Sequence, residues 1–372
     1  MRVDDISPGW VNRVIAGFGR YTLAPCADVV TEPIPNERVQ VHRLLLRYSP
    51  GPGLRPDSLI LKTPVRPALP GGVRSGYDAG AREAYFFRHL AGSATMATPR
   101  CYAVDFDPLS NSSIILFEDL SIRGLRQGNR VSGIRQGEAQ TIVRELAELH
   151  ARYWARTQGP AFRELESLTQ AVTTAADDAI RGYYQDAWPA VEACGLYEIS
   201  PDVAQFGRSL LEDPNRAKHK LSERPQTILH GDVHVENIFF DDTVEPARVT
   251  LFDWEDVTIG NGLSDVAWLV TTSVGTGDVE WEAELVRHYY EALLAAGIED
   301  YSWGECQADY RLAIENVFVQ GVLNSCVERG ESAEEIAAEH ELGQRYMLAA
   351  HRGRIWEIRD SKGVAGQTAT YR

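Results

Sequence analysis

Lysine is scarce in this chain of 372 residues, in which Lys and Arg together number only 37. Acidic residues number 53, so the formal net charge at pH 7 is −16. Non-specific binding of nucleic acid needs a basic face, and this shortage of positive charge argues against a nucleic-acid partner. An acidic surface would suit a cationic substrate, although solubility alone is the simpler explanation. The lysines are Lys62, Lys218, Lys220 and Lys362.

The chain also lacks paired cysteines and long hydrophobic runs. Its five cysteines are scattered and form no Cys-x-x-Cys motif, which suits reduced thiols in a cytoplasmic protein. No uninterrupted run approaches the ~20 apolar residues of a membrane helix. Residues 1–10 (MRVDDISPGW) lack the apolar core of a signal peptide. We therefore expect a cytoplasmic protein with no membrane partner, and the oligomeric state stays open.

The hydrophobic pattern changes along the chain. Strand-like segments dominate the first third, as in 39–49 (VQVHRLLLRYS) and 58–62 (SLILK), and a helix-like segment follows at 79–91. Beyond a Gly-rich connector at 121–137, apolar residues recur at helical spacing, interrupted by one pair of short strands, NIFF and RVTLFDW. This order predicts an α+β protein with a small β-rich lobe and a larger, mainly helical lobe.

We expect the boundary between these lobes near residue 120. Residues 1–120 would form the N-terminal lobe and residues 121–360 the helical lobe. The last segment, 361–372, has little to pack and is expected to be a frayed tail.

Polar residues concentrate between two strand-like segments in the stretch ILHGDVHVENIFF, residues 228–240. A metal-dependent hydrolase is one interpretation, because His230, Asp232 and His234 form a dense set of metal ligands. Binuclear phosphoesterases often add a Gly-Asn-His element. The Gly-Asn pairs of this chain are followed by Arg130 and Gly262 instead, which disfavours that class.

Phosphoryl transfer is the second interpretation of the same stretch. It needs a carboxylate near the accepting hydroxyl and hard oxygen ligands for Mg²⁺. Asp232 can accept the hydroxyl proton, and Asn237, five residues later, offers an amide oxygen to the metal. Asp253, on the next strand-like segment, offers a charged oxygen. This Asp-x₄-Asn…Asp arrangement has the spacing of a protein-kinase catalytic loop followed by its metal-binding Asp.

These residues carry a resemblance to a known superfamily. HGDVHVEN, followed by LFDWEDVTIGNGLSDVAWL, resembles the aminoglycoside phosphotransferase/choline kinase-like superfamily, and in particular its ecdysteroid-kinase-like branch. The resemblance covers roughly residues 38 to 270. It implies a protein-kinase-like two-lobed fold and transfer of the γ-phosphate of ATP to a small-molecule hydroxyl. It implies Asp232 as catalytic base, and Asn237 and Asp253 as Mg²⁺ ligands.

The resemblance also extends to the end of the first lobe. The segment LFEDL resembles the family's hinge, whose backbone meets adenine, and this places Phe117, Glu118 and Asp119 at the nucleotide. Residues 1–120 would then be the nucleotide-binding lobe. Residues 121–360 would carry the catalytic loop and the substrate pocket.

Four further polar residues flank the proposed catalytic groups. His230 is expected to hydrogen-bond the loop backbone rather than to act as a ligand. His234 stands where a protein kinase often has Lys, and a role at the phosphate or substrate and a scaffolding role are equally open. Asp265 is expected to order the loop or to cap the next helix. Glu255 could lie near the metal ions or be solvated, and the second is favoured.

Lys62 is the only lysine before residue 218 and ends an apolar strand. A charged group among apolar neighbours is costly unless it is paired. A compact ammonium suits the α- and β-phosphates of ATP, and Glu83 on the following helix-like segment is the natural partner. The resemblance implies the same pair. The segment VVTEPIPNERVQV, which would cover the phosphates, departs from the family because it contains no glycine. Weak affinity for ATP, or a preference for another nucleotide, is therefore left open.

Few residues separate Asp253 from Asp265, so the chain lacks the long activation segment with which protein kinases bind peptides. This favours a small-molecule acceptor, which could be an aminoglycoside, an amino alcohol, a sugar or a steroid-like alcohol. An active ATP- and Mg²⁺-dependent phosphotransferase is favoured over a pseudokinase-like binding protein, because Lys62, Asp232, Asn237 and Asp253 are all present.

Overall fold

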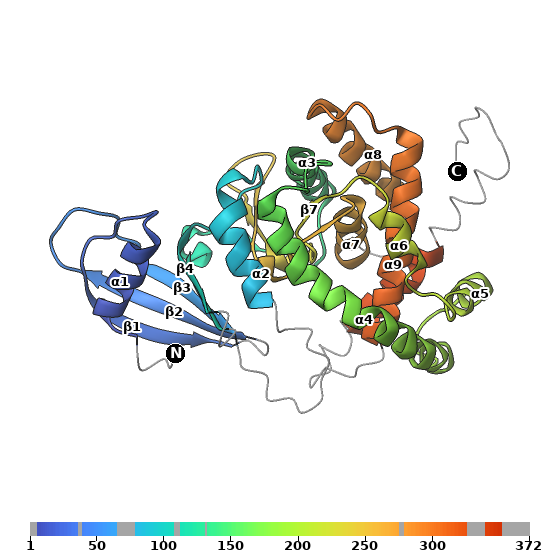
Figure 1. Ribbon diagram of the computed structural model, residues 1–372, viewed down its shortest axis with the longest axis horizontal. Helices are drawn as coiled ribbons and strands as arrows, with labels where there is room; N and C mark the ends of the chain where they lie inside the picture. The colour runs from blue at the N-terminus through green and yellow to red at the C-terminus, as the bar shows by residue number, and fades with distance from the viewer. Residues whose placement is uncertain are drawn as a thin grey trace.

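The computed structural model describes residues 6–35, 39–64, 79–107, 112–130, 132–274, 279–325 and 339–351. Within these ranges the chain forms a β-rich N-terminal lobe and a larger, mainly helical C-terminal lobe, side by side in an elongated molecule (Figure 1). The predicted two-lobed α+β architecture is confirmed. The predicted tail, 361–372, lies outside the described residues. Among the described helices, none has the length and apolar content to cross a membrane.

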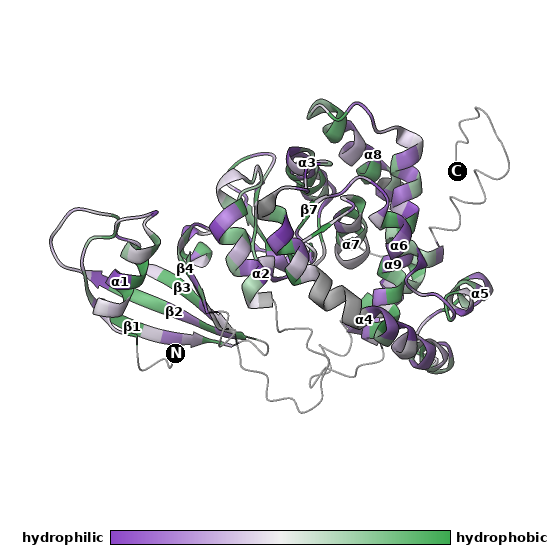
Figure 2. Ribbon diagram, viewed as in Figure 1, coloured by the Kyte–Doolittle hydropathy of each residue, from purple (hydrophilic) through white to green (hydrophobic). Residues whose placement is uncertain are grey.

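The N-terminal lobe is built on one antiparallel sheet with the strand order β1-β2-β3-β5-β4. The strands carry both hydrophobic and hydrophilic residues (Figure 2). In β2, Leu44 and Leu46 are buried whereas Leu45 between them is exposed, because successive side chains of a strand point to opposite faces. Leu44 and Leu59 on the inner face pack with Val11 and Ile15 of helix α1 (Pro8–Phe18). The strands are β1 (Cys26–Ile34), β2 (Val39–Tyr48), β3 (Ser58–Pro64), β4 (Cys101–Asp107) and β5 (Ser112–Glu118).

Helix α2 (Ala79–Tyr85) connects the sheet to the other lobe. It continues into a π-helical turn, η2 (Phe86–Leu90), and a 3-10 turn, η3 (Ala91–Ser93), so the helix predicted over 79–91 is present with an irregular second half. On one side α2 packs against β4 and β5. On the other it packs against the turn η6 (Trp254–Asp256) of the C-terminal lobe.

The C-terminal lobe surrounds two small sheets with helices. Helix α3 packs along α8, and α7 packs along α9, each pair burying the apolar stripes that the sequence pattern indicates. Residues 339–351 form another helix. The numbered helices are α3 (Gln136–Tyr153), α4 (Pro160–Ala193), α5 (Pro201–Ser209), α6 (Arg216–Ser222), α7 (Leu263–Ser273), α8 (Val279–Ala295) and α9 (Trp303–Ser325).

The two small sheets hold the polar stretch of the sequence. The predicted strand pair is present as β8 (Ile238–Asp241) and β9 (Arg248–Leu251), and β7 (Thr227–Leu229) pairs with β10 (Thr258–Gly260). The Gly-rich connector predicted at 121–137 has short regular elements in its first part. It contains a 3-10 turn, η4 (Leu120–Arg123), and a strand, β6 (Arg126–Gln127), that pairs with β8. A strand of two residues is too short to leave a periodic pattern in the sequence.

Candidate functional site

The polar loop, residues 230–237, is tied to helix α7 by a buried carboxylate. Asp265 accepts hydrogen bonds from the backbone N–H groups of His230 and Gly231 at 2.8 Å and 3.0 Å. Gly231 has φ +88, and a Cβ there would lie 2.2 Å from the carbonyl oxygen of Asp256. Only glycine fits this close approach. The prediction that Asp265 orders the loop is confirmed.

His230 is a scaffolding residue, as expected. Its side chain is fully buried, and Nε2 donates to the carbonyl oxygen of Phe252 at 2.9 Å. Its Nδ1 accepts from the backbone N–H of Asp232 at 3.2 Å. Because both ring nitrogens are used within the fold, neither is available to a metal ion.

The Asp232 carboxylate is held by three donors. Nε1 of Trp268 donates to Oδ1 at 2.8 Å, while Nδ2 of Asn237 and Nε2 of His234 lie 3.4 Å from Oδ2. Burial raises the pKa of Asp232, but the hydrogen bonds and charge of His234 and the Trp268 donor outweigh it and lower that pKa to about 2. Asp232 is therefore ionised at neutral pH.

Asn237 and Asp253 reach the same place from adjacent strands. Asn237 directly precedes β8, and its Nδ2 also donates to the backbone oxygen of Asp232 at 3.0 Å. The amide oxygen of Asn237 therefore points away from Asp232. Asp253 follows β9 with φ 65 and ψ 64. A non-glycine residue in this left-handed conformation costs about 1–3 kcal/mol and is typical of functional sites.

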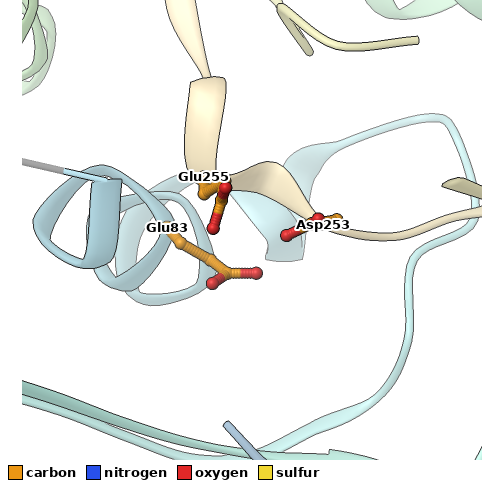
Figure 3. Close-up of side chains that lie close together, drawn as sticks. All are labelled: Glu83, Asp253 and Glu255. Atoms are coloured by element: carbon orange, nitrogen blue, oxygen red, sulfur yellow. The ribbon is translucent and has the colours of Figure 1, made fainter. Parts of the chain in front are cut away.

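A cluster of three carboxylates surrounds the single early lysine. Nζ of Lys62 lies 2.9 Å from Glu83 and 3.2 Å from Glu255, and it also donates to Asp253. Figure 3 shows the three carboxylates facing one another, Glu83 from α2, Glu255 from the η6 turn and Asp253 from the residue before that turn. The ion pair between Lys62 and Glu83 that the sequence predicts is present.

The charges in this cluster do not balance. Burial lowers the pKa of Lys62, but Glu83, Asp253 and Glu255 together raise it well above its usual value, so the ammonium stays charged. Burial raises the pKa of Glu83 to about 7, with Lys62 opposing it. Glu83 is therefore partly protonated near pH 7, and the single ammonium faces Asp253 and Glu255 as well. A divalent cation would neutralise the negative charge that remains.

The expectation that Glu255 is solvated is wrong. Its side chain is 22% exposed and forms the ion pair with Lys62 described above. The η6 turn brings Asp253 and Glu255 to one side of the chain, whereas Trp254 between them is buried and stacks on Phe86. This arrangement depends on the turn, which the sequence spacing does not reveal.

The proposed hinge residues support the fold with their side chains. Phe117 is buried in the sheet, and Glu118 exchanges two hydrogen bonds of 2.8 Å with the backbone of Arg100. The buried Asp119 carboxylate accepts from Arg43 at 2.7 Å and from Ser58 at 2.8 Å. Only backbone groups of this segment would therefore be available to an adenine ring.

A cavity of about 490 Å³ brings the polar residues together. Asp232, Asn237 and Asp253 all line it, whereas the hinge residues do not. Val39 at the start of β2 also lines it, so the glycine-free β1–β2 hairpin reaches the site, although its residues 36–38 lie outside the described ranges. His234 and Glu255, which the sequence analysis names, also line it. Sequence reasoning missed three further polar lining residues, Gln127, Asn129 and Glu236.

Sequence reasoning also missed Trp268. It lies three residues after Asp265 on α7, and residues three apart share one face of a helix. This spacing in the segment SDVAW is the signal that could have found it, because Asp265 already points to the polar loop.

The two-lobed fold and the paired strand lysine and helix glutamate place the chain in the class of kinase-like proteins. The family model of the ecdysteroid kinase-like family matches residues 57–298, well over half of the chain. The chain belongs to that family. The curated proteins contain no match.

Three solved structures share the fold at low identity. The microcompartment-associated aminopropanol kinase has a TM-score of 0.53 at 13% identity, over 93% of this chain and 97% of its own. A Ralstonia eutropha JMP134 protein, provisionally named an aminoglycoside phosphotransferase, has 0.50 at 14%, over 94% and 97%. Choline kinase from Cryptosporidium parvum Iowa II has 0.50 at 9%, over 90% and 89%. The protein-kinase-like two-lobed fold is thus confirmed.

Proposed function

We propose that the protein is an ATP- and Mg²⁺-dependent phosphotransferase that moves the γ-phosphate to a hydroxyl of a small molecule. One observation carries the proposal. Asp232, Asn237 and Asp253 line one cavity, and Asp253 is joined to the ion pair of Lys62 and Glu83. In this proposal residues 1–120 bind the nucleotide, and residues 121–360 carry the polar loop and the acceptor pocket.

The donor set fits a hard divalent cation. Asn237 and Asp253 offer an amide and a carboxylate oxygen beside the excess negative charge around Lys62, and such oxygens are the ligands that Mg²⁺ prefers. Bound there, Mg²⁺ would neutralise phosphate charge during transfer. Lys62 would hold the α- and β-phosphates, and Glu83 would orient its ammonium. The backbone of 117–119 would meet the base.

Asp232 orients the acceptor and takes its proton. The acceptor oxygen forms the new bond to the γ-phosphorus, the bond from that phosphorus to the bridging oxygen of ADP breaks, and the hydroxyl proton passes to Asp232. A carboxyl with a pKa of about 2 is a weak base. It serves chiefly to orient the hydroxyl, which suits a loose transition state that needs little proton abstraction before transfer.

The acceptor is proposed to be an alcohol. The structural neighbours include an aminopropanol kinase and a choline kinase, whose names point to amino alcohols. Aminoglycosides, sugars and steroid-like alcohols belong to the same proposal. The hydrolase alternative is disfavoured because His230 uses both ring nitrogens within the fold.

A thermal-shift screen followed by turnover tests this function. Nucleotides with Mg²⁺ are crossed with a library of hydroxylated amines, sugars and sterols, since a ligand of the native state raises the midpoint. We expect a stabilising pair that releases ADP and yields a phosphorylated alcohol by mass spectrometry. Stabilisation by nucleotide without any phosphoryl transfer would instead support a pseudokinase-like binding protein.

A further inference from the structure

Trp268 gives the two oxygens of the Asp232 carboxylate different surroundings. Its indole N–H donates to Oδ1 at 2.8 Å, the normal length of a strong hydrogen bond to a carboxylate. The two donors at Oδ2, from His234 and Asn237, are both at 3.4 Å. Contacts of that length are weak, so Oδ2 can exchange them for an incoming hydroxyl more readily than Oδ1 can release the indole.

The indole itself is held firmly in place. Trp268 lies on α7, half-buried, with the Tyr346 ring of the helix 339–351 at 6.2 Å between centroids. Tyr346 in turn is pressed against α9, where a Cβ on Gly321 would come within 2.2 Å of its ring. Thr272, one turn along α7, donates to the backbone oxygen of Trp268 at 2.7 Å. A donor packed in this way can fix the rotation of the carboxylate that it contacts.

Trp268 and Asp265 lie on the same face of α7 and contact different parts of the polar loop. Asp265 fixes the backbone of the polar loop, and Trp268, one turn later, reaches the Asp232 side chain. The bond is not needed to complete the loop backbone, because the backbone N–H groups of residues 230 and 231 are satisfied by Asp265. Its direct effect is on the orientation and charge of the carboxylate.

We propose that Trp268 is a positioning residue, which holds Oδ1 of Asp232 so that Oδ2 is the oxygen presented to the accepting hydroxyl. This inference rests on the proposed phosphotransferase function. Trp268 touches neither nucleotide nor acceptor in this proposal, and it acts only through Asp232.

The hydrogen bond is tested first by a measurement that needs no activity. The chain has eight tryptophans, so the Trp268→Phe variant identifies the Trp268 indole N–H resonance in a ¹H–¹⁵N spectrum. In the otherwise unchanged protein, Asp232→Asn should shift this resonance upfield, because an ionised acceptor is replaced by a neutral one. An unmoved resonance would show that the bond does not exist.

The positioning role is tested by steady-state kinetics with MgATP, in which the release of ADP reports the reaction. Phosphate is transferred to the acceptor identified in the screen, or to water where no acceptor is found. Trp268→Phe should keep its melting temperature within a few degrees and lower kcat by roughly tenfold to a hundredfold. Its KM for ATP should change less than threefold. Trp303→Phe is the matched control, since Trp303 is also half-buried but packs against Tyr290, away from the cavity.

The outcomes distinguish failure of the positioning role from failure of the phosphotransferase function. A Trp268→Phe enzyme with unchanged kcat overturns the positioning role even if the indole resonance responds to Asp232→Asn. A loss confined to KM for ATP also overturns it, because that would be an effect on nucleotide binding. If the unmodified protein transfers phosphate to no acceptor and not to water, the phosphotransferase function fails, whereas the indole resonance still decides whether the hydrogen bond exists.

Discussion

Phe86 and Trp254 stack with their ring centroids 3.7 Å apart and their planes 6° from parallel. Phe86 lies one turn after Glu83, and Trp254 lies between Asp253 and Glu255. The stack therefore joins the helix of the N-terminal lobe to the turn of the C-terminal lobe at the point where the three carboxylates meet Lys62. It sets the separation between the groups proposed to bind phosphate and those proposed to bind metal.

Removing one ring of this stack should damage both stability and the site. Trp254→Ala should lower the free energy of unfolding by about 3–5 kcal/mol, because the ring is fully buried and leaves a cavity. Urea unfolding measures the loss. Tyr183→Ala, at a tyrosine that is 55% exposed, should cost less than about 0.5 kcal/mol. Equal losses in the two variants would show that the stack has no special importance.

Asp232→Asn should keep the fold and nucleotide binding but lose turnover. Loss of a positioned base typically costs ~10²–10⁴-fold in rate, and the amide keeps the shape of the side chain. Steady-state kinetics with the identified acceptor provide the test, with nucleotide affinity measured by calorimetry on the same preparation. Near-native turnover would remove Asp232 from the proposed role.

Asp253→Ala should abolish the enhancement of ATP binding by Mg²⁺. The charged oxygen is the stronger ligand for a hard cation, and Asn237 alone would hold it weakly. Titration calorimetry with ATP, with and without Mg²⁺, measures the difference. Asp105→Ala, an exposed carboxylate on β4, is the control and should leave the enhancement intact. The same Mg²⁺ dependence in Asp253→Ala would place the metal elsewhere.

Lys62→Arg should be far from neutral despite the conserved charge. The ammonium contacts three carboxylates at once, and a broad, planar guanidinium cannot reproduce that arrangement of contacts. We expect kcat/KM for ATP to fall roughly tenfold to a thousandfold, or ~1.4–4 kcal/mol. Glu83→Gln should lower the same parameter, and the double variant should lose less than the sum. Additive losses would mean that the two residues act independently.

The low pKa of Asp232 predicts how stability changes with pH. The pKa of Asp232 is about 2 in the folded state, against an ordinary value of 3.8. Its contribution to the free energy of unfolding is therefore present above about pH 4 and is lost as the pH falls toward 2. That contribution is about 2 kcal/mol. The stability difference between the unmodified protein and Asp232→Asn should therefore shrink between pH 4.5 and pH 2.5 in urea unfolding. A constant difference would show that His234 and Trp268 do not favour the ionised form.

The sequence by itself determined the chemistry of the candidate site and the class of fold. The Asp-x₄-Asn spacing, the later Asp253 and the isolated Lys62 identify groups whose types and order are features of the chain alone. The change from strand-like to helix-like hydrophobic periodicity likewise predicts the two lobes, because periodicity reflects which face of each element is buried. The predicted partner of Lys62, Glu83, followed from charge and from the resemblance.

Only the tertiary structure decided which further side chains join these groups in the candidate site. Glu255 and Asp253 face Lys62 together because the η6 turn buries Trp254 between them against Phe86. Trp268 reaches Asp232 because α7 is fixed below the polar loop by Asp265. Strand β6 exists because β8 offers it an edge to pair with. Each of these contacts joins segments distant in sequence or depends on a local turn, and neither kind leaves a periodic pattern in the chain.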